Sequence, residues 1–368
     1  MLCSLLIWWA WTETVTTIEA VGVLTNNLTE EEFVIKPKPS QVVAKGLYLT
    51  AYSAGSSKKI DEIINLIDKT ELNAVVIDIK DYSGKVLYDS QIKLVNDLKT
   101  DDNRLGDVKS LIEKLHAKNI YVIARQTVFQ DPILANKKPE LAIRAKGGGV
   151  WRDYKGLAWV DPSRKEVWSY NVAIAKEAIN FGFDEINFDY VRFPSDGNME
   201  QAVYSKDYAD LKRITQITKY EVMKQFFHFL NVKLSGEPVW ISLDMFGLVM
   251  EKNGEDDMRI GQRIADAADE VDYISPMMYP SHYPSGYLGL KNPAQHPAKV
   301  FENGMKQGEP KFKNKRAQVR PWLQAFNLGA VYGAEKIRAQ IDAVEKYDNA
   351  GWLLWNAANR YSEAGLKK

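Results

Sequence analysis

The sequence predicts a single parallel (β/α)8 barrel, the eight-stranded TIM barrel, and three observations favour this fold class. Eight strand-like segments alternate in order with helical segments, and parallel strands need crossover connections of this kind. The length of 368 residues suits one barrel of about 250 residues with insertions. No glycine-rich phosphate-binding turn follows the first strand, which disfavours the alternative of a doubly wound nucleotide-binding sheet.

The expected strands are short runs of β-favouring residues, and the expected helices between them show apolar residues at helical spacing. In chain order the strands are residues 46–52, 74–81, 120–129, 183–193, 239–246, 272–279, 319–326 and 351–357. The helices are residues 59–70, 108–118, 164–181, 204–234, 260–268 and 334–347. Together they predict a barrel over residues 45–360, followed by a tail over residues 361–368.

Residues 1–44 are predicted to lie outside the barrel, as an amino-terminal segment followed by a polar, proline-containing linker or arm. The apolar run 5–11 (LLIWWAW) is far too short to cross a bilayer and is similar to the apolar core of an export signal. We therefore expect a secreted or envelope-associated protein. No Lys or Arg precedes the run, so the alternative is an ordinary hydrophobic segment of a cytoplasmic protein.

The overall composition excludes several function classes. The 48 basic residues balance the 48 acidic ones, so there is no electrostatic basis for binding nucleic acid. One Cys and four His give no cluster typical of a metal site, and we expect neither a metal nor a cofactor. No other stretch is apolar enough to span a membrane. Ten Trp and 18 Tyr fit a core and also a groove that stacks against sugar rings. The sequence predicts no particular oligomeric state.

The segment 182–194 (GFDEINFDYVRFP) is the most informative part of the chain, because it combines a strand pattern with several charges. Carboxylates are costly inside a sheet unless they are paired or face a solvated pocket. Active sites of (β/α)8 barrels lie at the carboxyl ends of the strands. Asp189, near that end, is therefore the first catalytic candidate; the alternative is an ion pair with Arg192 or Arg125. Asp184 and Glu185 begin the strand, and we expect solvated or capping roles for them.

Two further carboxylates complete the predicted catalytic set. Asp244 ends the next strand, so its carboxyl group should lie near that of Asp189. Asp78 is the substitute, although a buried Asp78–Lys80 pair on one face of the second strand explains it equally well. The predicted substrate-binding residues are charged, aromatic and amide side chains at strand ends or in the loop after the third strand. They are Asp81, Arg125, Trp151, Trp159, Arg192, Tyr279, Trp322, Gln324, Trp355 and Asn356, with barrel packing as the alternative.

The loop between the third strand and its helix is unusually long. Long loops inside compact domains are usually functional or disordered. Residues 132–163 hold Gly147, Gly148 and Gly149 beside several aromatic residues. We expect this loop to cover the mouth at the carboxyl ends of the strands, with Trp151 or Trp159 lining it.

From residue 46 to about 359 the sequence resembles a bacterial family of glycoside-hydrolase-like (β/α)8 domains, long classed as a domain of unknown function. The resemblance is carried by KGLYLTAY, VVIDIKDYSG, WVDPS, GFDEINFDYVRFP, SPMMYPSHY, RPWLQAF and GWLLWNA. It implies the barrel fold and the hydrolysis of glycosidic bonds. A more distant similarity is to chitinase-type glycoside hydrolases, whose fourth strand carries DxxDxDxE. Val191 stands at the position of their catalytic acid and cannot donate a proton, so their mechanism does not carry over.

Two functions follow as hypotheses. The first is a glycoside hydrolase that cleaves a cell-wall or environmental polysaccharide with paired carboxylates. The second is a non-catalytic, carbohydrate-binding barrel of the cell envelope. A second carboxyl group about 5–10 Å from Asp189 would favour hydrolysis. Adjacent strand ends favour the shorter separation, which is that of retaining enzymes. The sequence does not assign the acid and the base between the aspartates.

Overall fold

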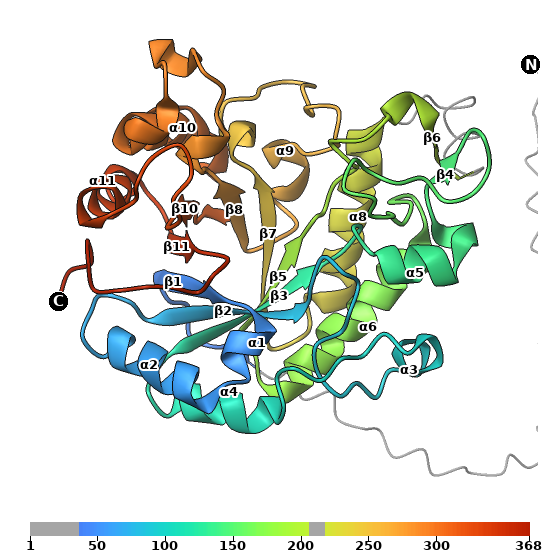
Figure 1. Cartoon of the computed structure of the whole chain (residues 1–368), viewed down its shortest axis with the longest axis horizontal. Coiled ribbons are helices and arrows are strands. Elements are labelled where there is room, and N and C mark those ends of the chain that lie inside the picture. Colours follow the sequence, from blue (N-terminus) through green and yellow to red (C-terminus); the bar gives the residue numbers. More distant parts are fainter. Residues whose placement is uncertain (1–36, 206–217) are drawn as a thin grey trace, which may run out of the picture. The chain divides into compact units, whose positions relative to one another are not determined.

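The computed structural model describes residues 37–205 and 218–368, which form a closed parallel barrel with helices around it (Figure 1). Its strands are β1 (Ala44–Leu49), β2 (Ala74–Lys80), β3 (Tyr121–Thr127), β5 (Glu185–Asp189), β7 (Trp240–Phe246), β8 (Tyr273–Met277), β9 (Gln318–Val319), β10 (Trp322–Gln324) and β11 (Gly351–Trp355). Neighbouring strands pair in parallel, and β10 pairs with both β8 and β11, which closes the barrel. The predicted (β/α)8 fold is confirmed. The expected export signal lies outside the described residues.

The helices follow the strands, as expected for crossover connections. They are α1 (Ala51–Ala54), α2 (Ser57–Ile67), α3 (Lys93–Leu98), α4 (Val108–His116), α5 (Pro132–Lys137), α6 (Lys165–Phe181), α8 (Lys219–Leu234), α9 (Ile264–Ala267), α10 (Pro297–Gly308) and α11 (Ala334–Val344). Helix α8 begins at Lys219, where Thr218 and Glu221 form a capping box, and residues 206–217 of the predicted helix lie outside the described residues. Helix α10, which begins at Pro297, was not predicted. No helix within residues 37–205 and 218–368 is long and apolar enough to cross a membrane.

One predicted strand is two. The expected strand 319–326 is interrupted between β9 and β10, where Pro321 has no N–H to donate to the sheet. The two halves together occupy one position of the barrel, between β8 and β11. The interruption places Arg320 inside the barrel with no exposed surface.

Apolar side chains fill two regions. The larger lies between the sheet and the surrounding helices, and the smaller lies inside the barrel, with Tyr48, Val76, Ile123 and Trp322 among its members. The inside is not wholly apolar, because buried polar side chains follow the inner face of β5 and its neighbours. These buried polar side chains continue along the strands to their carboxyl ends.

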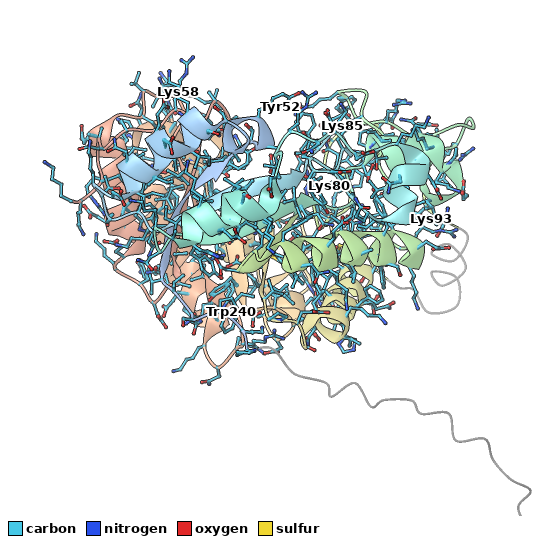
Figure 2. All side chains as sticks on the ribbon, turned by 90° about the horizontal axis from the view of Figure 1, so that it is seen from below. Tyr52, Lys58, Lys80, Lys85, Lys93 and Trp240 are labelled. Atoms are coloured by element: carbon cyan, nitrogen blue, oxygen red, sulfur yellow. The ribbon has the colours of Figure 1, made fainter. Side chains whose placement is uncertain are left out.

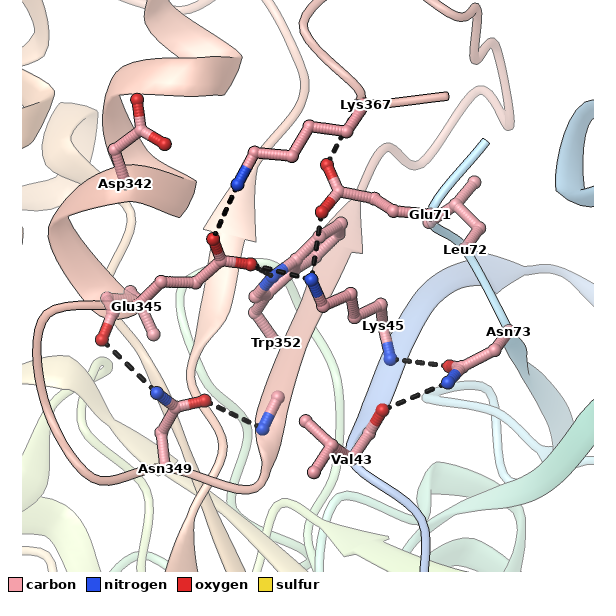
Figure 3. Close-up of polar contacts among 12 residues, drawn as sticks. Val43, Lys45, Glu71, Leu72, Asn73, Asp342, Glu345, Asn349, Trp352 and Lys367 are labelled. Atoms are coloured by element: carbon pink, nitrogen blue, oxygen red, sulfur yellow. Dashed lines mark hydrogen bonds and ion pairs between the residues drawn. The ribbon is translucent and has the colours of Figure 1, made fainter. Parts of the chain in front are cut away.

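Ion pairs reinforce the closing contact between β1 and β11 at the amino ends of the strands (Figure 3). The Lys45 ammonium lies 2.8 Å from Glu71 and 2.7 Å from Glu345. Lys367, in the predicted tail, lies 3.1 Å from Glu345, and its backbone carbonyl accepts a bond of 2.9 Å from Glu71. The end of the chain therefore packs against this contact between the first and last strands, which we call the seam.

The last residues of the predicted arm contact the amino ends of the strands. Lys38 pairs with Asp272 at 3.1 Å, and the carbonyl of Pro39 accepts a bond of 3.0 Å from the Trp240 indole. Figure 2 shows Trp240 on the opposite side of the described barrel from Tyr52 and Lys85, which follow the carboxyl ends of β1 and β2. The two faces of the barrel thus carry different features, and the site described next lies at the carboxyl ends.

Candidate active site

A cavity of about 450 Å³ opens at the carboxyl ends of β3, β5, β7, β8 and β11. Its walls combine two arginines, two aspartates and a majority of aromatic and apolar side chains. The lining residues are Arg125, Asp189, Tyr190, Arg192, Asp244, Phe246, Gly247, Leu248, Met277, Tyr279, His282, Tyr283 and Trp355. The position is the one at which barrel enzymes carry their chemistry.

The two leading catalytic candidates meet in this cavity. Strands β5 and β7 pair with Phe188 opposite Leu243, so the next residues, Asp189 and Asp244, lie side by side on strands about 4.8 Å apart. Both carboxyl groups contact one guanidinium: Arg125 Nη2 binds Asp189, and Arg125 Nε lies 3.7 Å from Asp244 Oδ2. Because one guanidinium contacts both carboxyl groups, their nearest oxygens are no farther apart than roughly 9.5 Å, the upper carboxyl separation in inverting glycosidases.

The surroundings of Asp244 favour its protonated form. The side chain is 1% exposed, and burial is the main cause that raises its pKa to about 8, with the charge of Asp189 adding to the effect. Its Oδ1 accepts hydrogen bonds from Asn187 Nδ2 at 3.0 Å and Trp322 Nε1 at 2.7 Å. Oδ1 accepts both hydrogen bonds, so Oδ2 is the oxygen without a hydrogen-bond donor; the charge of Arg125, whose Nε lies 3.7 Å from Oδ2, acts to lower the pKa.

Asp189 is also buried, and its carboxyl oxygens contact a cation and a backbone donor. Arg125 forms the ion pair, and the backbone N–H of Tyr190 donates to Oδ1 at 2.6 Å. Tyr190 has a φ of 53°, a left-handed conformation that is uncommon for residues other than glycine. This turn at the end of β5 aims the N–H at the carboxylate. The alternative Asp189–Arg192 ion pair is not formed.

Asp78 is buried beside the pair but does not line the cavity. It accepts a hydrogen bond of 2.5 Å from the Tyr48 hydroxyl and pairs with Arg125 Nη1 at 2.6 Å, while burial raises its pKa. The alternative of a buried Asp78–Lys80 pair is not formed. A register shift between Asp78 and Lys80 turns the lysine away from the barrel, where its ammonium lies 2.8 Å from Asp131.

The two tryptophans of the long loop do not line the cavity, contrary to expectation. Trp151 and Trp159 are 2% and 1% exposed, and their indole N–H groups bind Asn198 and Asp153 at 2.9 and 3.0 Å. Isolated antiparallel bridges link residues within the loop, and its strand β4 (Arg144–Ala145) pairs with β6 (Ala202–Val203), which follows β5. Trp159 lies behind the cavity wall, with its ring 5.7 Å from that of Tyr190.

Four other predicted substrate-binding residues have structural contacts and do not line the cavity. Asp81 accepts bonds from the backbone and hydroxyl of Ser83 in the turn after β2. Gln324 and Asn356 bind backbone atoms of the loops around the mouth. Trp322 acts on the site indirectly, through its hydrogen bond to Asp244.

Tyr279, Trp355, Arg125 and Arg192 do line the cavity. The Trp355 ring stacks on Tyr48 with centroids 3.8 Å apart, and the Arg125 guanidinium lies 4.9 Å from the Trp355 ring. Sequence reasoning missed the apolar lining, including Phe246, Met277 and Tyr283. In the sequence these side chains have the pattern of ordinary core residues, so no signal distinguishes them.

Glu185 also differs from expectation. It is completely buried inside the barrel, where Arg320 binds both of its oxygens. The Ser242 hydroxyl donates to Glu185 at 2.5 Å and accepts from Asn187 Nδ2 at 3.0 Å. This column of hydrogen bonds fixes Asn187, which in turn binds Asp244. Asp184, one residue earlier, has the expected capping role, because its carboxylate accepts a bond of 2.8 Å from the Val122 N–H.

Comparison with known proteins gives a family match and several fold matches. A family model described as "Putative glycosyl hydrolase domain" matches residues 46–361. A hypothetical protein from Ruminiclostridium thermocellum is 37% identical over 54% of this chain and 96% of its own, with a TM-score of 0.49. No curated protein sequence matches.

Two solved glycoside hydrolases share the fold at low identity. The glycoside hydrolase domain of PgaB (BpsB) from Bordetella bronchiseptica is 12% identical over 85% of this chain and 94% of its own, with a TM-score of 0.60. Alpha-L-fucosidase isoenzyme 2 from Paenibacillus thiaminolyticus is 12% identical over 88% of this chain and 47% of its own, with a TM-score of 0.56. Similarity at this level shows a common fold.

Proposed function

Because the chain belongs to the glycosyl hydrolase domain family over residues 46–361, we propose that it cleaves O-glycosidic bonds of a cell-wall or environmental polysaccharide. Asp244 is the general acid, and Asp189 is its ionised partner. Arg125 holds the carboxylate of Asp189 in place. The cavity at the strand ends is the substrate site, and Tyr279 and Trp355 are the side chains that contact the sugar rings.

One observation carries the proposal: two neighbouring carboxyl groups share one arginine beside a cavity, and burial raises the pKa of one of them, Asp244. Glycosidases use such a pair, one acid and one carboxylate, on either side of the scissile bond. Burial raises the pKa of Asp244 to about 8, while Arg125 forms an ion pair with Asp189. With that pKa, Asp244 can donate a proton at neutral pH.

The proposed reaction begins with a proton transfer from Asp244. Asp244 Oδ2 gives its proton to the glycosidic oxygen, which leaves with the electron pair of the broken bond. The carboxylate of Asp189 then forms a bond to the anomeric carbon, and water later hydrolyses that glycosyl ester with Asp244 as base. The in-register position of the two residues on adjacent strands supports this retaining course over an inverting one.

The test is hydrolysis of a polysaccharide panel by the full chain, with release of reducing ends and the anomeric form of the first product as readouts. Asp269→Asn is the matched control, because Asp269 is an exposed aspartate that pairs with Lys315. Cleavage by the wild type and the control, and its loss in Asp189→Asn and Asp244→Asn, is the expected result. Cleavage that survives in both site variants would refute the assignment.

The second candidate is a non-catalytic, carbohydrate-binding barrel. It is favoured by the ion pair between Arg125 and Asp189, which occupies the oxygen that would attack. Binding without cleavage over the whole panel would support it. We also propose a secreted or envelope-associated location, on the basis of the apolar run at residues 5–11. Recovery of the full chain only in the cytoplasmic fraction would contradict that location.

A further inference from the structure

Arg192 stands out among the buried arginines of the described residues. These are Arg125, Arg192 and Arg320, with exposed fractions of 6%, 8% and 0%. Arg125 pairs with aspartates and Arg320 with Glu185. In the described part of the chain, no carboxylate lies within the ion-pair distance of 4.0 Å from Arg192. It is the one buried arginine there without a counter-ion.

The closest contacts of Arg192 are with neutral groups instead. Its Nη1 donates to the carbonyl of Phe193 at 3.1 Å and to the hydroxyl of Ser195 at 3.2 Å. Three aromatic rings surround the guanidinium, with centroids at 5.0 Å for Trp159, 5.0 Å for Tyr190 and 4.7 Å for Phe246. These contacts hold the plane of the guanidinium in one orientation and offset part of the cost of its burial.

An unpaired buried cation destabilises a fold, so its retention calls for a reason. Burial lowers the pKa of Arg192, and the more distant charges of Asp189, Asp196 and Asp153 act against this effect without offsetting it. The guanidinium also lines the cavity that holds Asp189 and Asp244. Since Nη1 alone is bound to the protein, the other N–H groups of the fork are available to a ligand in that cavity. A planar fork of this kind suits an anionic group bound through two oxygens.

We infer that the cavity binds a sugar with an anionic substituent and that Arg192 is the group that recognises it. The substituent presents two or more anionic oxygens, as do the carboxylate of a uronic acid and a sulfate ester. The inference rests on the proposed function for the location of the bond that is cleaved. Recognition of the anion itself needs only the cavity and Arg192.

The first experiment measures binding of the full chain to paired polymers by calorimetry at constant ionic strength. One pair is polygalacturonate and its methyl ester, and the other is dextran sulfate and dextran. We expect one anionic polymer to bind at least about tenfold more tightly than its neutral partner, the scale of one charge-assisted bidentate contact. The pair that shows the difference identifies carboxylate or sulfate. Equal binding within both pairs overturns the inference.

Variants then separate recognition from general charge. Arg192→Met should abolish the preference for the anionic polymer, and Arg192→Lys should restore part of it. Arg263→Gln is the matched control, because that guanidinium also lies over a ring, 3.5 Å from the Tyr220 centroid, yet pairs with Asp266 outside the cavity. A preference that persists in Arg192→Met, or falls equally in the control, contradicts the inference.

Thermal unfolding supplies the readout that distinguishes a structural role. Arg192→Met removes an uncompensated charge, so its midpoint should equal or exceed that of the wild type. Arg320→Met leaves Glu185 unpaired and should lower the midpoint. If both variants lower it alike, Arg192 is structural and the inference fails. Anion-selective binding without cleavage would refute hydrolysis alone, whereas cleavage of neutral polymers without anion selectivity would refute only this inference.

Discussion

Replacing Asp244 by asparagine should change the pH dependence of stability in a way that requires no knowledge of the substrate. The amide has nearly the shape of the protonated carboxyl group, and its oxygen can accept the same bonds from Asn187 and Trp322. The variant therefore keeps the packing and loses only the titration. The comparison between the two proteins therefore reports the titration of Asp244 together with its coupling to Asp189.

The sign and size of this pH dependence follow from the raised pKa of Asp244. In the folded wild type the pKa of Asp244 is about 8, against an ordinary value of 3.8. Between these values the folded state holds a proton that the unfolded state has released, so stability from this group is complete below about pH 4. It is lost at up to about 1.4 kcal/mol per pH unit as the pH rises towards 8. The total is about 6 kcal/mol, as an upper limit.

Urea unfolding of wild type and Asp244→Asn at pH 5, 6, 7 and 8 measures this directly. We expect the variant to become steadily more stable relative to the wild type across the series. Asp269→Asn, which changes an exposed aspartate paired with Lys315, should show a constant difference. A constant or falling difference for Asp244→Asn would refute the conclusion that Asp244 is the protonated member of the pair.

Three further predictions concern other charged residues. Asp189→Asn should reduce turnover by at least about 100-fold on any polysaccharide that the wild type cleaves, measured by reducing-end release; near-normal turnover would place the partner of Asp244 elsewhere. Glu185→Gln should lower the free energy of unfolding by about 3–5 kcal/mol, because it leaves Arg320 as an unpaired buried charge; a loss below about 1 kcal/mol in urea unfolding would contradict this. Burial acts to raise the pKa of Glu345, but hydrogen bonds from Lys45 and Lys367 lower it to about 2. The stabilising effect of Glu345 is therefore present above about pH 4.5 and is lost as the pH falls towards 2. Glu345→Gln should therefore cost about 1 kcal/mol at pH 7, a value reduced by solvent screening, and almost nothing at pH 2; a gap in melting temperature that widens in acid would contradict the assignment.

The fold was predictable because a parallel barrel leaves a strong pattern in the sequence. Strands that are buried on both faces consist of apolar and β-branched runs, as in residues 74–77 of β2, and helices with one apolar face separate them. Asp189 and Asp244 were predictable for a related reason. They are charged residues at the ends of such runs, and the order of the strands places those ends together.

The interior partners were not predictable, because their recognition depends on distance in the fold. Glu185 binds Arg320, which lies 135 positions away in the sequence, and nothing near Glu185 indicates that its carboxylate points inward. The same limit applies to Trp159. A loop tryptophan can face a groove or pack behind it, and only the fold of the loop, with β4 against β6, places the indole behind the wall.

The seam between β1 and β11 bears on how the barrel folds. Lys45 and Glu345 are 300 positions apart, so the contact between them closes a very long loop, and such contacts form late and slowly. Until then β1 and β11 are open edges with unpaired backbone groups, which can pair with another chain. The concentration at which the protein refolds should therefore decide between closure and aggregation. The ion pairs around Lys45 act when the barrel closes, which is the step that covers the open edges of β1 and β11.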